Sequence, residues 1–253
     1  MIASAATTVL VPGAWMGGWI WEPTVERLRD RSIDAETISL GGLQPHESSA
    51  DIAAVRLDDH VRQLVELVES KGSRPVILVS HSYSGIVTAS AADRLGDQVL
   101  GLIHVGAFVP TSRRSLLDDW GSSDNERARE RADIEAAGGL WLAPAREMLD
   151  HEADLAPSDR DFLAARFTPH PGRTILDPAE LSAPVEHQPS TYVALTPSGG
   201  LEQAWNGAPP VAKTASEWRR KHIVSGHWPM VSALDATVDL LEAEIHHYDT
   251  TQG

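Results

Sequence analysis

The chain of 253 residues contains no cysteine. This absence excludes disulfide bonds, thiolate metal ligands and a cysteine nucleophile. The chain also lacks an apolar run of about 18 residues, the length that a membrane-spanning helix needs. Its first residues have neither the basic segment nor the long apolar core of a secretory signal. Together these absences predict a cytoplasmic protein without a membrane partner.

Positive charge is scarce as well. Lysine and arginine number 21 against 36 aspartates and glutamates, a formal net charge of -15. This excess of negative charge disfavours nucleic acid as a partner. We find no Walker loop, no dinucleotide fingerprint and no His/Asp cluster at metal-ligand spacing. We therefore expect no metal and no cofactor, and a small molecule as the partner. The sequence leaves the oligomeric state open, a homodimer included.

Along the chain, strand-like runs alternate with segments of helical periodicity. Short runs typical of strands, most of them apolar, lie at 7–11, 35–40, 75–79, 99–105, 190–195 and 220–224. Helical periodicity marks 21–30, 49–70, 86–92 and about 230–246. Strands alternating with helices of this length predict an α/β fold, with a mainly parallel sheet flanked by helices.

One long segment breaks this alternation. Residues 110 to about 188 combine charged helical stretches, prolines and scattered large apolar residues, without a convincing strand. We predict a single domain whose core comprises 1–110 and 189–253, with 111–188 as a helical lid. Such an insertion would lie over the carboxyl ends of the strands, where α/β sheets bind ligands. A purely structural helical subdomain is the alternative.

A serine lies at the sharpest junction between a predicted strand and a predicted helix. The stretch Val79-Ser80-His81-Ser82-Tyr83-Ser84-Gly85 follows the strand ending at Val79 and precedes an apolar helix. Strand, turn and helix with a serine at the tip form the nucleophile elbow, usually written G-x-S-x-G. Both flanking glycines are serines here, the next smallest polar choice. Ser82 is thus the candidate nucleophile.

Four segments together carry a family resemblance. They are Val9-Leu10-Val11-Pro12-Gly13-Ala14-Trp15-Met16-Gly17-Gly18-Trp19, Ser80 to Gly85, Ala107-Phe108-Val109-Pro110 with Ser115-Leu116-Leu117, and Ser225-Gly226-His227-Trp228-Pro229-Met230. The chain resembles a bacterial group of α/β-hydrolases related to the plant methylesterase and hydroxynitrile lyase family. The resemblance spans the chain and is weakest in the predicted lid. It implies the α/β-hydrolase fold with a helical lid.

The resemblance also implies a set of site residues. His227 matches the family's late catalytic histidine, which removes the proton from the serine during attack and returns it to the leaving group. The backbone N–H groups of Ala14 and Tyr83 would form the oxyanion hole. The large aromatic side chains in and around these segments are candidates for the substrate pocket, namely Trp15, Trp120, Trp141 and Trp228.

The acid of the triad is missing from both places where the family carries it. Ser198 and Gly106 stand at those positions, and neither can carry charge. Three explanations stay open. A nearby carboxylate reaches His227 from a shifted loop, with Glu202, Asp118 and Asp119 as candidates. Alternatively, Ser82 and His227 work as a dyad, with Ser198 or water holding the imidazole. In the third, the site no longer hydrolyses anything.

Hydrolysis through an acyl-enzyme is the leading interpretation. The substrate would be a small hydrophobic ester, thioester or lactone, such as one from secondary metabolism. A lyase or cyclase on the same Ser-His pair is the second hypothesis. Hydroxynitrile lyases of the family have a threonine and a lysine where this chain has Gly13 and Trp228, which disfavours cyanohydrin cleavage. A protein that only binds a ligand is the third.

Overall fold

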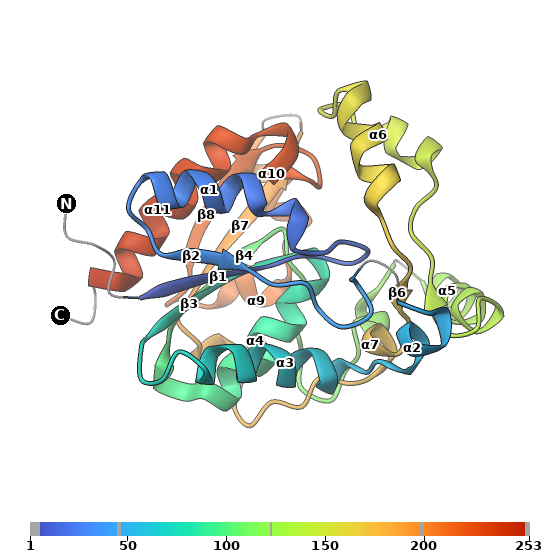
Figure 1. Cartoon of the computed structure of the whole chain (residues 1–253), viewed down its shortest axis with the longest axis horizontal. Helices are drawn as coiled ribbons and strands as arrows, with labels where there is room; N and C mark the ends of the chain where they lie inside the picture. The colour runs from blue at the N-terminus through green and yellow to red at the C-terminus, as the bar shows by residue number, and fades with distance from the viewer. Residues whose placement is uncertain (1–5, 45–46, 122, 198–199, 251–253) are drawn as a thin grey trace.

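A six-stranded sheet forms the centre of the computed structural model, which describes residues 6–44, 47–121, 123–197 and 200–250 (Figure 1). The strand order is β2-β1-β3-β4-β7-β8, and every neighbouring pair is parallel. The strands are β1 (Thr7–Val11), β2 (Ala35–Thr37), β3 (Val76–His81), β4 (Val99–Val105), β7 (Ser190–Thr196) and β8 (Arg219–Val224). The predicted α/β architecture is confirmed.

Helices cover both faces of this sheet. Helices α1 (Glu22–Asp30) and α11 (Leu234–Thr250) lie on one face, and α3 (Leu57–Glu69) and α4 (Gly85–Leu95) lie on the other (Figure 1). The four inner strands β1, β3, β4 and β7 are buried along nearly their whole length because helices cover both of their faces, whereas the edge strands β2 and β8 are partly exposed. Their side chains alternate between two cores: Leu10, Ile77 and Ile103 pack toward α1 and α11, and Val9, Leu78 and Leu102 toward α3 and α4.

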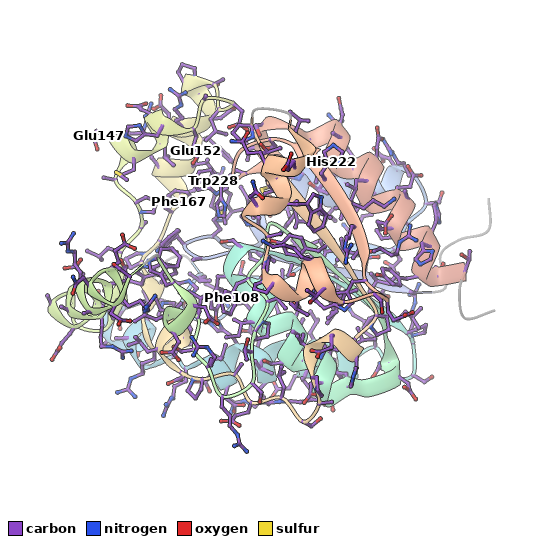
Figure 2. All side chains as sticks on the ribbon, turned by 180° about the vertical axis from the view of Figure 1, so that it is seen from behind. Phe108, Glu147, Glu152, Phe167, His222 and Trp228 are labelled. Carbon is purple, nitrogen blue, oxygen red and sulfur yellow. The ribbon has the colours of Figure 1, made fainter. Side chains whose placement is uncertain are left out.

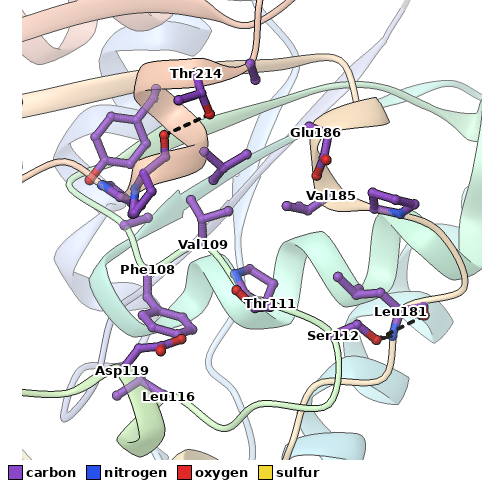
Figure 3. Close-up of a pocket in the computed structure, with 18 of the residues that line it drawn as sticks. Phe108, Val109, Thr111, Ser112, Leu116, Asp119, Leu181, Val185, Glu186 and Thr214 are labelled. Atoms are coloured by element: carbon purple, nitrogen blue, oxygen red, sulfur yellow. Dashed lines mark hydrogen bonds between the residues drawn. The ribbon is translucent and has the colours of Figure 1, made fainter.

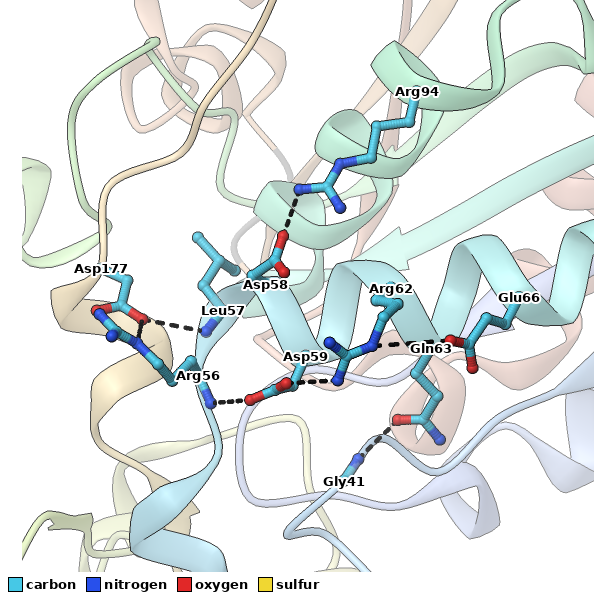
Figure 4. Close-up of polar contacts among 10 residues, drawn as sticks. All are labelled: Gly41, Arg56, Leu57, Asp58, Asp59, Arg62, Gln63, Glu66, Arg94 and Asp177. Atoms are coloured by element: carbon cyan, nitrogen blue, oxygen red, sulfur yellow. Dashed lines mark hydrogen bonds and ion pairs between the residues drawn. The ribbon is translucent and has the colours of Figure 1, made fainter.

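The helix predicted over 49–70 is two helices, α2 (Ser49–Ala54) and α3. Arg56 has an extended backbone between them and is the N-cap of α3. Its N–H donates to the Asp59 carboxylate at 2.9 Å, and its guanidinium makes two hydrogen bonds to Asp177, at 2.9 and 2.7 Å (Figure 4). This cap and the ion pair to a distant residue stabilise the break, which the apolar periodicity alone does not reveal.

Two other elements differ from the predicted ones at their ends. Strand β2 ends at Thr37, before the predicted 40. The last helical segment divides into α10 (Pro229–Ser232) and α11, because Ala233 between them leaves the helical backbone conformation with φ -138° and ψ 45°. Neither difference changes the order of the elements.

The segment between β4 and β7 contains residues 111–188, which we call the insertion. It holds α5 (Asp124–Ala136), α6 (Pro157–Arg166), α7 (Arg173–Leu176) and the short turns Leu117–Asp119, Arg146–His151 and Val185–His187. The prediction that no strand interrupts it is wrong, since β5 (Leu140–Trp141) and β6 (His170–Pro171) form a small antiparallel pair. Figure 1 shows α6 projecting beside the core, away from the two termini.

The remaining helical elements connect the last strands and turns of the core. They are α8 (Leu201–Asn206), α9 (Pro210–Thr214) and the short turns Gly18–Ile20, Ser82–Ser84 and Gly96–Gln98. In the part of the chain that the structure describes, no helix combines the length and the apolar content that a bilayer crossing needs.

Candidate active site

Ser82 lies at the tip of the turn between β3 and α4. Its φ of +51° is in the left-handed region, which costs a non-glycine residue of order 1 to 3 kcal/mol and is concentrated at functional sites. The carbonyl of Ser82 accepts a hydrogen bond from the Phe108 N–H at 2.8 Å, which ties the turn to the segment after β4. The strain presents the hydroxyl at the carboxyl end of the sheet.

The serines that flank the elbow are part of its framework. Ser84 is buried, accepts from the His81 N–H at 2.9 Å and donates to the Val11 carbonyl at 2.8 Å, so it links the turn to β1. Ser80 is also buried, and its hydroxyl lies 2.8 Å from Nδ1 of His104. The two serines therefore fill positions where the motif usually has glycine, with every hydroxyl hydrogen-bonded.

His227 reaches the same point from the loop after β8. Its Nε2 lies 3.1 Å from the Ser82 Oγ, within hydrogen-bonding reach of a general base. Burial lowers the pKa of the His227 imidazole to about 4, which keeps it neutral and able to accept a proton at pH 7. Next to Ser82 in the sequence, His81 donates from Nε2 to the His227 carbonyl at 2.7 Å and so stabilises the loop that carries His227.

The opening loop packs directly against the elbow. A Cβ built on Gly13 would lie 2.8 Å from the Nδ1 of His81 and 3.0 Å from the Ser82 Cβ, so only glycine allows this approach. Ala14 follows at once, and both Ala14 and Tyr83 are buried. That the backbone N–H groups of these two residues form an oxyanion hole stays a prediction.

Trp15 has a structural role beside this loop. Its φ is +64°, and its strained backbone is held by hydrogen bonds from the Thr168 N–H at 3.0 Å and to Nδ1 of His170 at 3.4 Å. Its indole N–H donates to the Trp141 carbonyl at 3.1 Å, and the two rings are 4.3 Å apart. Hydrogen bonds with residues of the insertion thus hold Trp15 and the opening loop in place.

A cavity of about 1360 Å³ opens beside Ser82 and His227. Apolar side chains from the segment after β4 and from the end of the insertion line it, among them Phe108, Val109, Leu116, Leu181 and Val185 (Figure 3). The motif Ala107-Phe108-Val109-Pro110 was a signal for this wall, since it directly follows a strand. The stretch 181–187 gave no such signal.

Two of the four tryptophans predicted for the pocket lie in its lining. They are Trp120 and Trp141. Trp15 and Trp228, the other two, are not in the lining of this cavity. Trp228 is buried, with its ring 6.0 Å from Phe167 and 5.0 Å from the His227 ring, so it packs behind the histidine (Figure 2).

None of the three carboxylates proposed as the triad acid contacts the His227 imidazole: two bind other residues, and the third is exposed. Asp118 accepts from the Ser115 N–H at 2.8 Å, which holds the pKa of that carboxyl below its usual value. Asp119 pairs with Arg114 at 2.5 Å, and Glu202 is exposed on α8. Within the described ranges, no carboxylate hydrogen-bonds to an imidazole nitrogen of His227.

Of the two positions where the resemblance places the triad acid, the structure describes only Gly106. Gly106, at the end of β4, has φ +51°, and a Cβ there would lie 2.5 Å from Cδ1 of Leu195. Leu195 thus occupies the space that an acidic side chain would need. Ser198 lies outside the described residues. The geometry that the structure does describe is a Ser-His pair.

The insertion meets the His227 loop through two acidic residues that the sequence did not point to. Asp154 accepts a hydrogen bond from the Gly226 N–H at 2.7 Å, and Glu152 accepts one from the backbone N–H of His227 at 3.5 Å. They are 72 and 75 residues distant in sequence from these partners. No spacing rule connects residues so far apart. Among the described residues, no cluster of His, Asp and Glu could hold a metal ion.

Comparison with known proteins shows which family the chain matches. A family model described as "Alpha/beta hydrolase family" matches residues 8–240. The chain belongs to this family. Methylesterases and an alpha-hydroxynitrile lyase of Arabidopsis thaliana are among its relatives, which confirms the resemblance drawn from the four motifs.

Individual relatives match part of the chain. A carbendazim hydrolyzing esterase of Nocardioides sp. (strain SG-4G) is 35% identical over 114 residues, 44% of this chain and 46% of that protein. Methylesterase 2 of Arabidopsis thaliana is 32% identical over 111 residues, 42% and 41%. The chain thus spans somewhat less than half the length of these relatives. An extracellular alpha/beta-hydrolase from a Paenibacillus species has the same fold, with a TM-score of 0.79 at 17% identity over 93% of this chain and 97% of that one.

Proposed function

We propose that the chain is a serine hydrolase that cleaves an ester of a hydrophobic small molecule through an acyl-enzyme on Ser82. The observation that carries the proposal is the 3.1 Å contact between the His227 Nε2 and the Ser82 Oγ at the wall of a large cavity. Relatives named as esterases and methylesterases support the same reaction class. Thioesters and lactones undergo the same acyl transfer and belong to the same proposal.

The proposed reaction has two stages. Neutral His227 takes the Ser82 proton while Oγ bonds to the ester carbonyl carbon, and the oxyanion is held by the N–H groups of Ala14 and Tyr83. The bond to the alcohol oxygen then breaks, and the imidazolium returns its proton to that oxygen. His227 then takes a proton from water while the water oxygen bonds to the acyl carbon. The bond from that carbon to the Ser82 Oγ breaks, the imidazolium returns the proton to Oγ, and the acid is released. Without a carboxylate on the imidazole, the imidazolium is less stable and we expect slow turnover.

The cavity supports a bulky apolar substrate. Its wall combines Phe108 and Val109 of the core with Trp120, Trp141 and Val185 of the insertion, while Asp119 lies at one side (Figure 3). Because the insertion supplies part of the wall, we infer that it acts as a lid that selects the substrate. Burial of apolar substrate surface would contribute about 25 cal/mol per Å².

A lyase or cyclase on the same pair is the second candidate. The observation that favours it is that the imidazole of His227 has no carboxylate partner in the described ranges. A single proton transfer by Ser82 and His227 needs less stabilisation of the imidazolium than two rounds of acyl transfer. Such a reaction would leave no acyl group on Ser82.

Labelling with a fluorophosphonate, read by intact-protein mass, tests the proposal. We expect one adduct on the wild type, none on Ser82→Ala, and unchanged labelling of Ser73→Ala, which removes an exposed hydroxyl outside the cavity lining. Hydrolysis of p-nitrophenyl esters should improve as the acyl chain lengthens. Failure of the wild type to label and to hydrolyse any of these esters would refute the hydrolase and leave the lyase or the ligand-binding protein.

A further inference from the structure

The catalytic histidine lies on a loop whose backbone is held by the insertion. Asp154, between α6 and the turn Arg146–His151, accepts hydrogen bonds from the Gly226 N–H at 2.7 Å and from the Ser225 hydroxyl at 3.2 Å. Both donors directly precede His227. One carboxylate therefore binds two consecutive residues of the loop that carries the imidazole.

The close approach of this carboxylate requires glycine at position 226. A Cβ built on Gly226 would overlap the Oδ1 of Asp154 and would lie 2.6 Å from a Glu152 oxygen. The Oδ1 of Asp154 is buried and has no hydrogen-bond partner among the described residues. Burial alone would raise the pKa of Asp154, but hydrogen bonds from Ser232 and the Gly226 N–H outweigh it and keep the pKa below the usual value. The carboxylate is therefore ionised at neutral pH.

The segment that carries Asp154 is itself anchored. Leu149 and Leu155 are buried in the same apolar core as Trp228, and Arg160 donates to the Glu152 carbonyl at 3.0 Å. Figure 2 shows Glu152 on the side of the insertion that faces Trp228. The position of Asp154 thus depends on how the insertion packs on the core.

We propose that Asp154 is a positioning residue that holds the Ser225–His227 loop, and through it the His227 imidazole, at Ser82. This inference rests on the proposed hydrolase function and deepens it. The usual triad acid binds the imidazole directly, whereas here an acid from the insertion binds the backbone before it. The packing of the insertion on the core therefore determines whether the His227 imidazole is aligned with Ser82.

Asp154→Ala tests this role, with Asp161→Ala as the matched control. Asp161 is an exposed carboxylate on α6 that pairs with Arg146, so its loss changes the charge of the insertion without touching the loop. We expect kcat of Asp154→Ala toward a p-nitrophenyl ester to fall about 10- to 100-fold, the range for loss of a hydrogen bond to a charged group. KM should stay within about threefold, because the cavity wall is unchanged. Asp154→Asn keeps an acceptor oxygen and should recover most of kcat.

A double-mutant cycle with Gly226→Ala separates this contact from a general loss of folding. Gly226→Ala alone should lower kcat because its methyl group displaces Asp154. In the Asp154→Ala background the overlap with Asp154 is gone and only the contact with Glu152 remains, so the same substitution should cost less than it does in the wild type. Equal kcat for Asp154→Ala and Asp161→Ala would overturn the inference, as would effects of Asp154→Ala and Gly226→Ala that simply multiply.

A second readout keeps this test independent of the proposed function. The ¹⁵N chemical shifts of the His227 imidazole report whether Nε2 accepts the Ser82 hydroxyl. They should change in Asp154→Ala and stay unchanged in Asp161→Ala, whether or not an ester is hydrolysed. A wild type that hydrolyses no ester but shows this difference refutes the hydrolase and keeps the positioning role; unchanged shifts in both variants refute the positioning role.

Discussion

Four buried histidines should make the fold sensitive to mild acid. His60, His81, His104 and His170 have no exposed surface. Burial lowers the pKa of His60 and His104 to about 4 and that of His81 to about 3, and it lowers the pKa of His170 well below its ordinary value. The rings are engaged as neutral groups: His60, for example, lies between the Tyr83 hydroxyl at 2.8 Å and the Gly41 carbonyl at 2.7 Å.

Proton linkage gives the sign and size of the change in the free energy of unfolding with pH. These pKa values are lower in the folded than in the unfolded protein, so the unfolded state binds protons first as the pH falls below 6.5. Between pH 7 and 5.5 each site then lowers the free energy of unfolding by about 1.2 kcal/mol, and four sites lower it by about 5 kcal/mol. Ordinary aspartates and glutamates titrate below this window. A typical domain has about 5 to 15 kcal/mol in total, so much of the stability should be lost.

Urea unfolding at a series of pH values from 5.5 to 7.5 measures this effect. The slope of the free energy against pH should approach five protons near pH 5.5, four from these rings and one from His227, whose pKa is also lowered to about 4. His104→Gln should reduce it by about one proton, while His222→Gln shows the effect of losing an exposed histidine (Figure 2). A free energy that changes by less than about 1 kcal/mol across the window would refute the assignment of these rings as buried and neutral.

Three further predictions concern single sites. Because the pKa of His227 is lowered to about 4, kcat/KM should stay level from pH 8 down to 5.5, whereas a histidine of ordinary pKa would already be mostly protonated at pH 5.5; a steep loss centred at pH 6.5 in still-folded protein would contradict this. Gly106→Asp should lower the melting temperature, through about 1 to 2 kcal/mol of left-handed backbone strain and about 1 to 3 kcal/mol of overlap with Leu195, and Leu195→Ala in the same chain should recover the second part. Arg56→Ala removes the exposed ion pair to Asp177 and should lower the midpoint of urea unfolding only slightly, because exposed pairs contribute little; a large fall in the midpoint would contradict this.

The features that depend on local pattern and on motifs could be predicted from the sequence. The six predicted strand segments are the six strands of the sheet, and the order of Ser82 and His227 along the chain anticipated their meeting at the carboxyl end of the sheet. The break after α2 was missed because Asp177, which binds Arg56, lies 121 residues later. Periodicity carries no information on such a partner.

The supports of the site were the least predictable part. Leu195 fills the space beside Gly106, and Asp154 binds the loop of His227 from the insertion. Both contacts join segments whose relative placement depends on the packing of the whole core. The candidate acids were chosen by nearness in sequence to the motifs, and nearness in sequence did not bring Asp118 or Asp119 into contact with the imidazole.

The most direct test of the central claim is a rapid-quench mass measurement with an activated hydrophobic ester. We expect the mass of one acyl group on the intact protein within the first turnover, located on the peptide that contains Ser82 and absent from Ser82→Ala. Release of product by the wild type without any acylated protein, at a rate that Ser82→Ala retains, would contradict the account.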